Sequence, residues 1–151
     1  MRTITCTRML DGTATCSVPH RHRHHSPDRV GLGYVGSAPA DLALNILAAA
    51  LPLAPGDNDV RLADDSRVSK AAWDLHEAFT RDIVARVPYD GGVISSQAIR
   101  DWVATQVERK QRQVDAARNT RKMNRFDGSA NGGRLHLALT RCVAAMAGWR
   151  R

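Results

Sequence analysis

Residues 31–36 form a Gly-x-Gly-x-x-Gly pattern that runs into an Ala- and Leu-rich segment. In a dinucleotide-binding turn, this pattern follows a hydrophobic strand, and an acidic residue about 20 positions later binds the ribose. Here the polar sequence HRHRHHSPD stands in place of the strand, and Asp57 and Asp59 fall in an expected loop. The pattern therefore does not predict a nucleotide site, and we expect no cofactor.

Side chains of the types that bind metals are concentrated early in the chain, at Cys16, His20, His22, His24 and His25. Zinc prefers thiolate and imidazole ligands, but a zinc site needs a second ligand pair at an ordered spacing, and none follows. The alternating His residues face one side only if the segment is extended. We interpret the segment as a solvated His- and Arg-rich run and predict no metal site.

Two further groups of residues could in principle support catalysis. His76-Glu77 begins the His-Glu-x-x-His pattern of zinc proteases, but Thr80 stands where the second His is needed. His76 lies on an apolar helical stripe, so we expect a hydrogen-bonded core residue. An acid–base or nucleophilic site would have to be assembled from His25, Asp28, Tyr34 and Ser37. These four match no recognised catalytic constellation, and we predict that the protein is not an enzyme.

The positive charge of the chain is concentrated in its last third. Residues 1–106 hold 11 Lys and Arg against 12 Asp and Glu, whereas residues 107–151 hold 11 against 3. A neutral body followed by a basic region is typical of proteins that meet nucleic acid or another polyanion. The candidate binding residues are Arg109, Lys110, Arg112, Arg118, Arg121, Lys122 and Arg125.

Two functions fit this charge distribution. We expect non-specific binding of nucleic acid, because the cations can contact phosphates and no motif that reads base sequence is present. Phe126 is the one aromatic residue near them, so stacking of single-stranded bases is not indicated. The alternative is a binding module or inhibitor that docks on an acidic surface of a host protein, with Trp102, Met146 or Trp149 as anchors.

The first 18 residues, with TITCTRML-DG-TATCSV, predict a β-hairpin around Asp11-Gly12. A two-residue turn places Met9 opposite Ala14 and the two cysteines on opposite faces. A three-residue turn with a left-handed Gly12 places Cys6 opposite Cys16. Only the second register pairs the thiols, and we favour the first. Cys6, Cys16 and Cys142 are odd in number and widely spaced, so we expect free thiols in a reducing compartment.

A helix is expected to follow the glycine-containing segment. It begins at Ser37, a candidate N-cap, carries Pro39 in its first turn and stops before Pro52. Asp41 is expected to complement the positive end of the helix dipole. Residues 52–68 are rich in Pro, Gly, Asp and Asn, which predicts an exposed loop.

Apolar residues at three- and four-residue steps predict a second helix from Ser69 to near Pro88. A turn over residues 89–92 follows. Ser95 or Ser96 then caps a third helix, which we expect to reach about residue 123 and to be too polar in its second half to bury much surface.

One segment contains His25, Ser26, Pro27, Gly33, Tyr34, Gly36, Ser37 and Pro39, followed by Ala40 to Leu44. These residues resemble the signature of a family of small uncharacterised bacterial and phage-borne proteins, which is close to HSPxGFEWGYGGSGPADLAL. The spacing from the His to the last Leu is the same. Phe79, Val84, Ala85 and Pro88, and the stretch ISSQAIRDWV, extend the resemblance over roughly residues 3–105. The family has no established activity, so the resemblance implies a fold and not a chemistry.

Together these features predict an α+β protein in which an N-terminal β-hairpin packs with three to four helices. We expect one domain over residues 1–106 and a basic helical extension over residues 107–151, with a last helix near residues 135–149. The most apolar segment is interrupted by Asn45 and Pro52 and is shorter than the roughly 20 residues that span a bilayer. No apolar leader follows Met1. We therefore expect a cytoplasmic protein that does not contact membranes; the sequence leaves its oligomeric state open.

Overall fold

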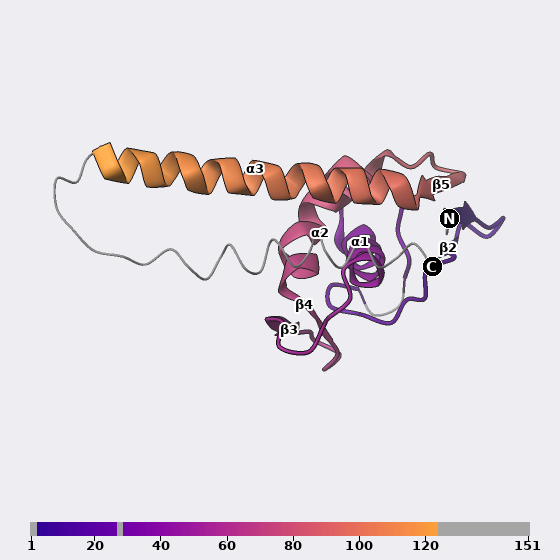
Figure 1. Ribbon diagram of the computed structural model, residues 1–151. Helices are drawn as coiled ribbons and strands as arrows, with labels where there is room; N and C mark the ends of the chain where they lie inside the picture. Colours follow the sequence, from indigo (N-terminus) through magenta and orange to yellow (C-terminus); the bar gives the residue numbers. More distant parts are fainter. Residues whose placement is uncertain (1–2, 27–28, 124–151) are drawn as a thin grey trace. The chain divides into compact units, whose positions relative to one another are not determined.

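The computed structural model describes residues 3–26 and 29–123 (Figure 1). Three α-helices, one short 3₁₀ helix and two small antiparallel sheets occupy these residues, which confirms the mixed α+β prediction. The chain divides into two structural units between Ala98 and Ile99. Pro27, Asp28 and everything after Met123 lie outside the described residues, including Arg125, Phe126, the predicted last helix and its residues Cys142, Met146 and Trp149.

The first sheet has the strand order β2-β1-β5, from β1 (Thr3–Arg8), β2 (Ala14–Cys16) and β5 (Gly91–Ser95). The predicted hairpin is present, but the two-residue turn is wrong. Met9 N–H donates to the Thr13 carbonyl at 2.8 Å, so the loop is Leu10-Asp11-Gly12, with Gly12 at a φ of 83°. Asp11 also accepts hydrogen bonds from the backbone N–H and the hydroxyl of Thr13. These contacts favour the longer loop and place Cys6 opposite Cys16.

The strand β5 occupies residues for which a turn and a helix cap were expected. Ile94 pairs with Ile4 of β1 across the sheet, and both side chains are buried. Gly91 and Gly92 conceal the strand in the sequence, because glycine is unfavourable in strands and common in turns. The partner strand lies more than 80 residues away, so local pattern could not reveal it.

The helix α1 (Ser37–Ala50) begins and ends where the sequence predicts. Its N-cap, however, is Gly36, and Ser37 is the first helical residue and makes no capping bond. Leu42, Ile46 and Leu47 are buried, and α1 packs against α2 (Lys70–Asp82). The hydroxyl of Ser69 accepts a hydrogen bond from Ala72 N–H at 3.3 Å, which confirms the predicted N-terminus of α2.

Part of the predicted loop over residues 52–68 forms a second hairpin, from β3 (Asp59–Arg61) and β4 (Arg67–Ser69). Leu62 and Val68 from this hairpin form a small apolar cluster with Leu44 of α1, and Trp73 packs against it. The polar residues around these two apolar side chains concealed the hairpin. After α2 the chain forms the 3₁₀ helix η1 (Val84–Arg86).

The helix α3 (Ser96–Met123) is continuous over 28 residues, or about 42 Å at 1.5 Å per residue (Figure 1). Ser95 caps it, because its hydroxyl accepts the Ala98 N–H at 3.0 Å. Ile99 and Val103 are buried, whereas the side chains described from residue 112 to residue 118 are all exposed. The helix passes through residue 106 without a break, and the expected domain boundary there stays a prediction. Within the described part of the chain, no helix combines the length and apolar character needed to cross a membrane.

Candidate functional site

The carboxylate of Asp41, in the second turn of α1, is completely buried and binds main-chain N–H groups. His25 N–H donates to it at 2.9 Å, Ser26 N–H at 2.7 Å and His24 N–H at 3.2 Å. A carboxylate removed from water needs several donors, and these three supply them. Asp41 thus fixes the main chain of residues 24–26 to α1. The prediction that it complements the helix end was wrong, because its partners belong to a different segment.

Asn45, one helical turn after Asp41, holds the preceding part of the same segment. Its side-chain oxygen accepts the N–H groups of Arg21 and His22, at 2.7 and 2.9 Å, and its amide donates to the His22 carbonyl at 2.7 Å. A further hydrogen bond from the amide to the Asp41 carbonyl uses its second proton. Asp41 and Asn45 therefore order residues 21–26, which we call the clamped segment, without a neighbouring strand.

The clamped segment alternates between solvent and protein. Arg21 and Arg23 are exposed, while His22 and His24 are half-buried. His22 Nδ1 lies 2.9 Å from the Ser66 hydroxyl, and burial lowers the pKa of His22 despite the nearby carboxylate of Asp64. The interpretation of this stretch as a solvated run was therefore wrong for His22 and His24, whereas His25 is exposed like Arg21 and Arg23. The sequence does carry a signal for this arrangement: Asp41 and Asn45 are polar residues spaced i, i+4 within an apolar helix. Buried polar groups require hydrogen-bond partners, so some other segment must supply them.

The β3–β4 hairpin also holds the clamped segment. Asp64 accepts the backbone N–H of Arg23 at 2.8 Å, and Ala63 N–H donates to Nδ1 of His24 at 3.2 Å. The proton of a neutral His24 must then be on Nε2. The clamped segment therefore connects α1 to the second hairpin through its main chain and its histidines.

Four aromatic rings gather at the end of the clamped segment: His24, His25, Trp73 and His76. Trp73 lies edge-on to His24, with ring centres 4.8 Å apart, and at the same distance from His76. His76 is buried, as predicted, and its Nδ1 bonds to the Trp73 carbonyl. A carbonyl only accepts, so His76 carries a proton on Nδ1, and in a neutral His76 the Nε2 accepts from His25 Nε2 at 3.1 Å. Burial lowers the pKa of His25, which favours the neutral form of His25.

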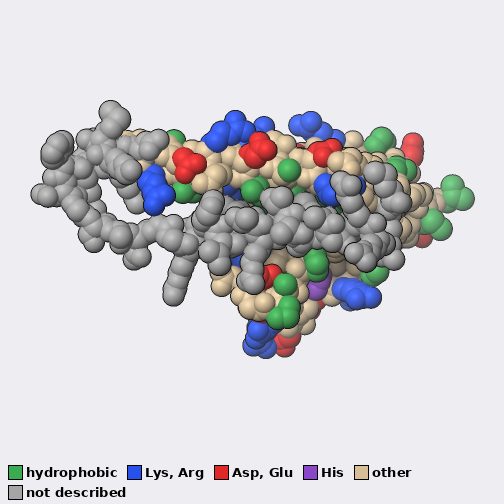
Figure 2. Space-filling view, in the orientation of Figure 1, with side chains coloured by type: hydrophobic (Ala, Val, Ile, Leu, Met, Phe, Trp, Pro, Cys, Tyr) green, Lys and Arg blue, Asp and Glu red, His purple; other side chains and the backbone are tan. Residues whose placement is uncertain are grey.

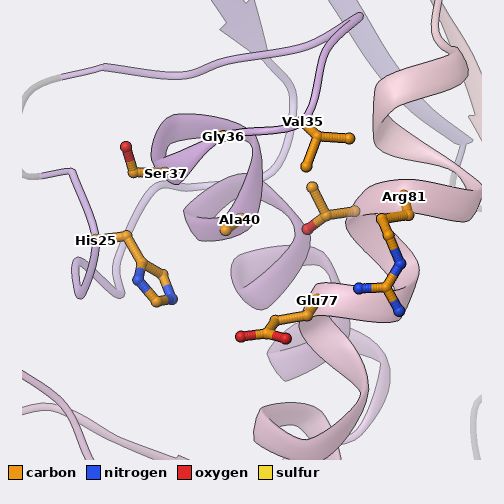
Figure 3. A pocket seen from close by; sticks show the side chains of 8 residues that line it. His25, Val35, Gly36, Ser37, Ala40, Glu77 and Arg81 are labelled. Carbon is orange, nitrogen blue, oxygen red and sulfur yellow. The ribbon is translucent and has the colours of Figure 1, made fainter.

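A shallow depression of about 330 Å³ opens beside His25 (Figure 3). Its lining combines the start of α1 with one side of α2: His25, Val35, Gly36, Ser37, Ala40, Glu77, Thr80 and Arg81. The volume is at the lower end of the range for small-molecule sites. In Figure 3 the imidazole of His25 and the hydroxyl of Ser37 point away from each other. His25 and Ser37 therefore both line the depression with their functional groups directed apart, and Tyr34, half exposed, does not line it.

The Gly-x-Gly-x-x-Gly pattern has a packing explanation. A Cβ on Gly31 would lie 2.5 Å from Cδ of the buried Pro39 and 2.8 Å from the Tyr34 hydroxyl. Gly33 has a φ of 80°, and its N–H donates to the Val84 carbonyl at 3.1 Å. These glycines allow the signature loop, residues 29–36, to fold closely over the start of α1. Across residues 3–26 and 29–123, no three His, Cys, Asp or Glu side chains are grouped so as to hold a metal ion.

A family model for proteins of unknown function, DUF6166, matches residues 1–105. The chain belongs to the DUF6166 family. The match contains the clamped segment, the signature loop and both sheets, and it confirms membership in a family of unknown function. The signature motif and the bacterial or phage origin stay predictions. Neither a curated protein nor a solved structure matches the chain.

The cationic part of α3 lies beyond the DUF6166 match. Arg109, Arg112 and Arg118 are exposed, and Lys110 is half-buried. Figure 2 shows Lys and Arg side chains along the helix, with acidic side chains among them. Arg121 and Lys122 are in the last turn of α3, but their side chains, like that of Arg125, are not among those that the structure describes.

Arg112 takes part in an ion pair within α3. Arg112 lies 3.5 Å from Glu108, and both side chains are at least 70% exposed. Asp115, the other nearby carboxylate, accepts a hydrogen bond from Gln111 at 3.0 Å. A solvated pair at this distance is weak and strongly screened by salt, so it leaves Arg112 available to a phosphate.

Proposed function

We propose that the protein binds nucleic acid without sequence specificity through the cationic half of α3. The observation that carries the proposal is a helix that continues past Val103, the last buried residue among its described side chains, and presents the exposed side chains of Arg109, Arg112 and Arg118. A helix with so little apolar surface gains little from packing on its own chain. Phosphates offer such cations a partner, and the release of counterions drives the binding.

The dimensions of the helix fit a nucleic-acid backbone. Arg109 and Arg118 are nine residues apart, or about 14 Å along the axis. One strand of duplex DNA carries a phosphate about every 3.4 Å of axis, so this length corresponds to about four base steps. Because nine residues make two and a half turns, Arg109 and Arg118 lie on opposite sides of the helix, and their long side chains would reach phosphates from either side of it. α3 continues to Met123, about 21 Å along the axis from Arg109, or about six steps. Glu108 and Asp115 reduce the local charge but leave a clear excess of cations.

The proposal has a quantitative signature in salt. With about five phosphate contacts, the logarithm of the binding constant falls with the logarithm of salt concentration with a slope near −4.5. Between 50 and 200 mM salt the affinity then decreases about 500-fold. Duplexes of different sequence should show the same slope, because no base edges are read.

Fluorescence anisotropy with a random-sequence duplex tests the proposal on the full chain. Replacing Arg109, Arg112 and Arg118 with Gln should weaken binding at least tenfold and reduce the salt slope by two to three. The matched control replaces Arg21, Arg23 and Arg29 with Gln, which removes the same charge from exposed side chains outside α3. Circular dichroism shows whether each variant folds.

Two results would refute the proposal: no binding to duplex or single-stranded nucleic acid at any salt concentration, or equal losses in the α3 variant and its control. The first would favour docking on an acidic protein surface through the same cations. The resemblance of residues 25–44 to bacterial and phage-borne proteins supports a further part of the proposal, namely that this is an accessory protein of phage or mobile-element origin that acts in the cytoplasm.

A further inference from the structure

The two described cysteines occupy a special position in the first sheet. Cys6 of β1 and Cys16 of β2 are directly opposite each other. Ser17 N–H donates to the Thr5 carbonyl at 2.9 Å, and Met9 N–H donates to the Thr13 carbonyl, so the hydrogen-bonded pairs alternate with the cysteine pair. Cys6 and Cys16 therefore form a non-hydrogen-bonded pair, the type in which facing Cα atoms are closest, at about 4.5 Å. That separation is within the range that a disulfide spans.

The sheet also makes Cys16 the one cross-strand side-chain neighbour of Cys6. The residue opposite Cys6 on β5 is Gly92, which has no side chain. The two sulfur atoms are 3.0 Å apart, and the Cys6 thiol donates to Cys16. A disulfide requires a further approach of about 1 Å, which small rotations about the Cα–Cβ bonds can supply.

The two thiols differ in accessibility and acidity. Cys6 is fully buried, whereas Cys16 is half-buried. The hydrogen bond from Cys6 lowers the pKa of Cys16 to about 7, while the same contact and burial raise the pKa of Cys6. Cys16 is therefore the sulfur that solvent reaches and the one that holds a thiolate near neutral pH, the form that attacks disulfides.

We propose that Cys6 and Cys16 are a redox-active dithiol that closes to a cross-strand disulfide by exchange with a low-molecular-weight disulfide. The Cys16 thiolate attacks one sulfur of the small disulfide, which forms a mixed disulfide and releases one small thiolate. Cys6 then loses its proton to that thiolate, and its sulfur attacks Cys16 Sγ. The bond from Cys16 to the small thiol breaks, and the second thiolate leaves and takes a proton from water. The protein dithiol is oxidised by two electrons, and the small disulfide is reduced to two thiols.

The test uses oxidised and reduced glutathione on the full chain with Cys142, which lies outside the described residues, replaced by Ser. After equilibration without oxygen, free thiols are trapped with N-ethylmaleimide and the protein is digested with trypsin. Cleavage after Arg8 separates residues 3–8, which hold Cys6, from residues 9–21, which hold Cys16. The wild-type chain is mapped in the same way, so that the result does not depend on a variant.

The expected result is two maleimide adducts on the reduced protein and none on the oxidised protein, with the two peptides joined by a disulfide. In a Cys6→Ser variant the reaction should stop at glutathione on Cys16. In a Cys16→Ser variant Cys6 should react at least tenfold more slowly, because it is buried. The alkylation rate of Cys16 should rise through a midpoint near pH 7.

Several results would overturn the proposal. Both thiols remaining open to maleimide in excess oxidised glutathione would show that the pair does not close. Glutathione held stably on Cys16 beside a free Cys6 would also show that the two cysteines do not close to a disulfide. Equal reactivity of Cys6 and Cys16 in the single variants would contradict the assigned order of attack.

Discussion

The burial of Asp41 makes a strong prediction about stability. Its carboxylate is inaccessible to solvent and accepts three backbone N–H groups, from His24, His25 and Ser26. In an Asp41→Asn variant the side chain keeps its shape, but one oxygen becomes an NH₂ group that faces donors. Hydrogen bonds to a charged group contribute about 1.5–3 kcal/mol each, and a buried donor without a partner costs about 1–3 kcal/mol. We therefore expect the free energy of unfolding to fall by about 2–4 kcal/mol.

Urea denaturation followed by circular dichroism measures this change. A small domain has a total stability of about 5–15 kcal/mol, so the loss should move the midpoint clearly to lower urea. Hydrogen exchange should also accelerate more at the amides of residues 24–26 of the variant than elsewhere in the first unit, because those N–H groups lose their acceptor.

The matched control is Asp64→Asn. Asp64 also accepts a backbone N–H, from Arg23, and a hydrogen bond from Ser66, but it is exposed and water can replace what the amide does not accept. Its substitution should cost less than about 1 kcal/mol. If the Asp41 and Asp64 variants lost equal stability, or if Asp41→Asn lost less than about 0.5 kcal/mol, the reasoning that burial makes Asp41 essential would be wrong.

Three further predictions concern individual side chains. Because burial lowers the pKa of His25, the NMR titration midpoint of His25 should lie below 6.5. The stability that neutral His25 contributes is then complete above pH 6.5 and is lost as the pH falls through its folded-state pKa. A midpoint above 6.5 would contradict the pairing with His76. Ser69→Ala removes the N-cap of α2 and a hydrogen bond to the Leu51 carbonyl. It should lower the free energy of unfolding by about 1–2 kcal/mol in urea denaturation. An unchanged urea midpoint would show that the cap is not needed. Gly31→Ala forces a Cβ against Pro39 and should lower the free energy of unfolding by about 1–3 kcal/mol in the same assay, without a change in duplex binding. A loss of duplex binding with intact folding would instead give the signature loop a direct role in that binding.

The helices, in which apolar residues recur at three- and four-residue steps, were predicted well. The start and end of α1 follow from apolar spacing and from Pro39 and Pro52, although its predicted cap, Ser37, was wrong. The Ser69 cap of α2 and the run of α3 to Met123 follow from capping residues and apolar spacing, which act within a few positions. The hairpin was predicted but its favoured register was wrong, because the side chain of Asp11 and the left-handed Gly12 stabilise a three-residue loop.

The clamped segment could not be predicted from its own residues. HRHRHH has the composition of a solvated run, and its order is imposed by Asp41 and Asn45, about 15 to 24 positions away. Similarly, β5 becomes a strand because β1 offers it hydrogen bonds, although its two glycines favour a turn. In both cases the deciding interactions are long-range.

The way in which Asp41 and Asn45 hold the clamped segment has a consequence for variation among related chains. They bind amide and carbonyl groups of the main chain, which every residue type except proline provides in full. Arg21 and Arg23 can therefore be exchanged for many other residues while the backbone path stays the same. A surface supported in this way can acquire new side chains, and with them new partners, without a change in the residues that hold its main chain.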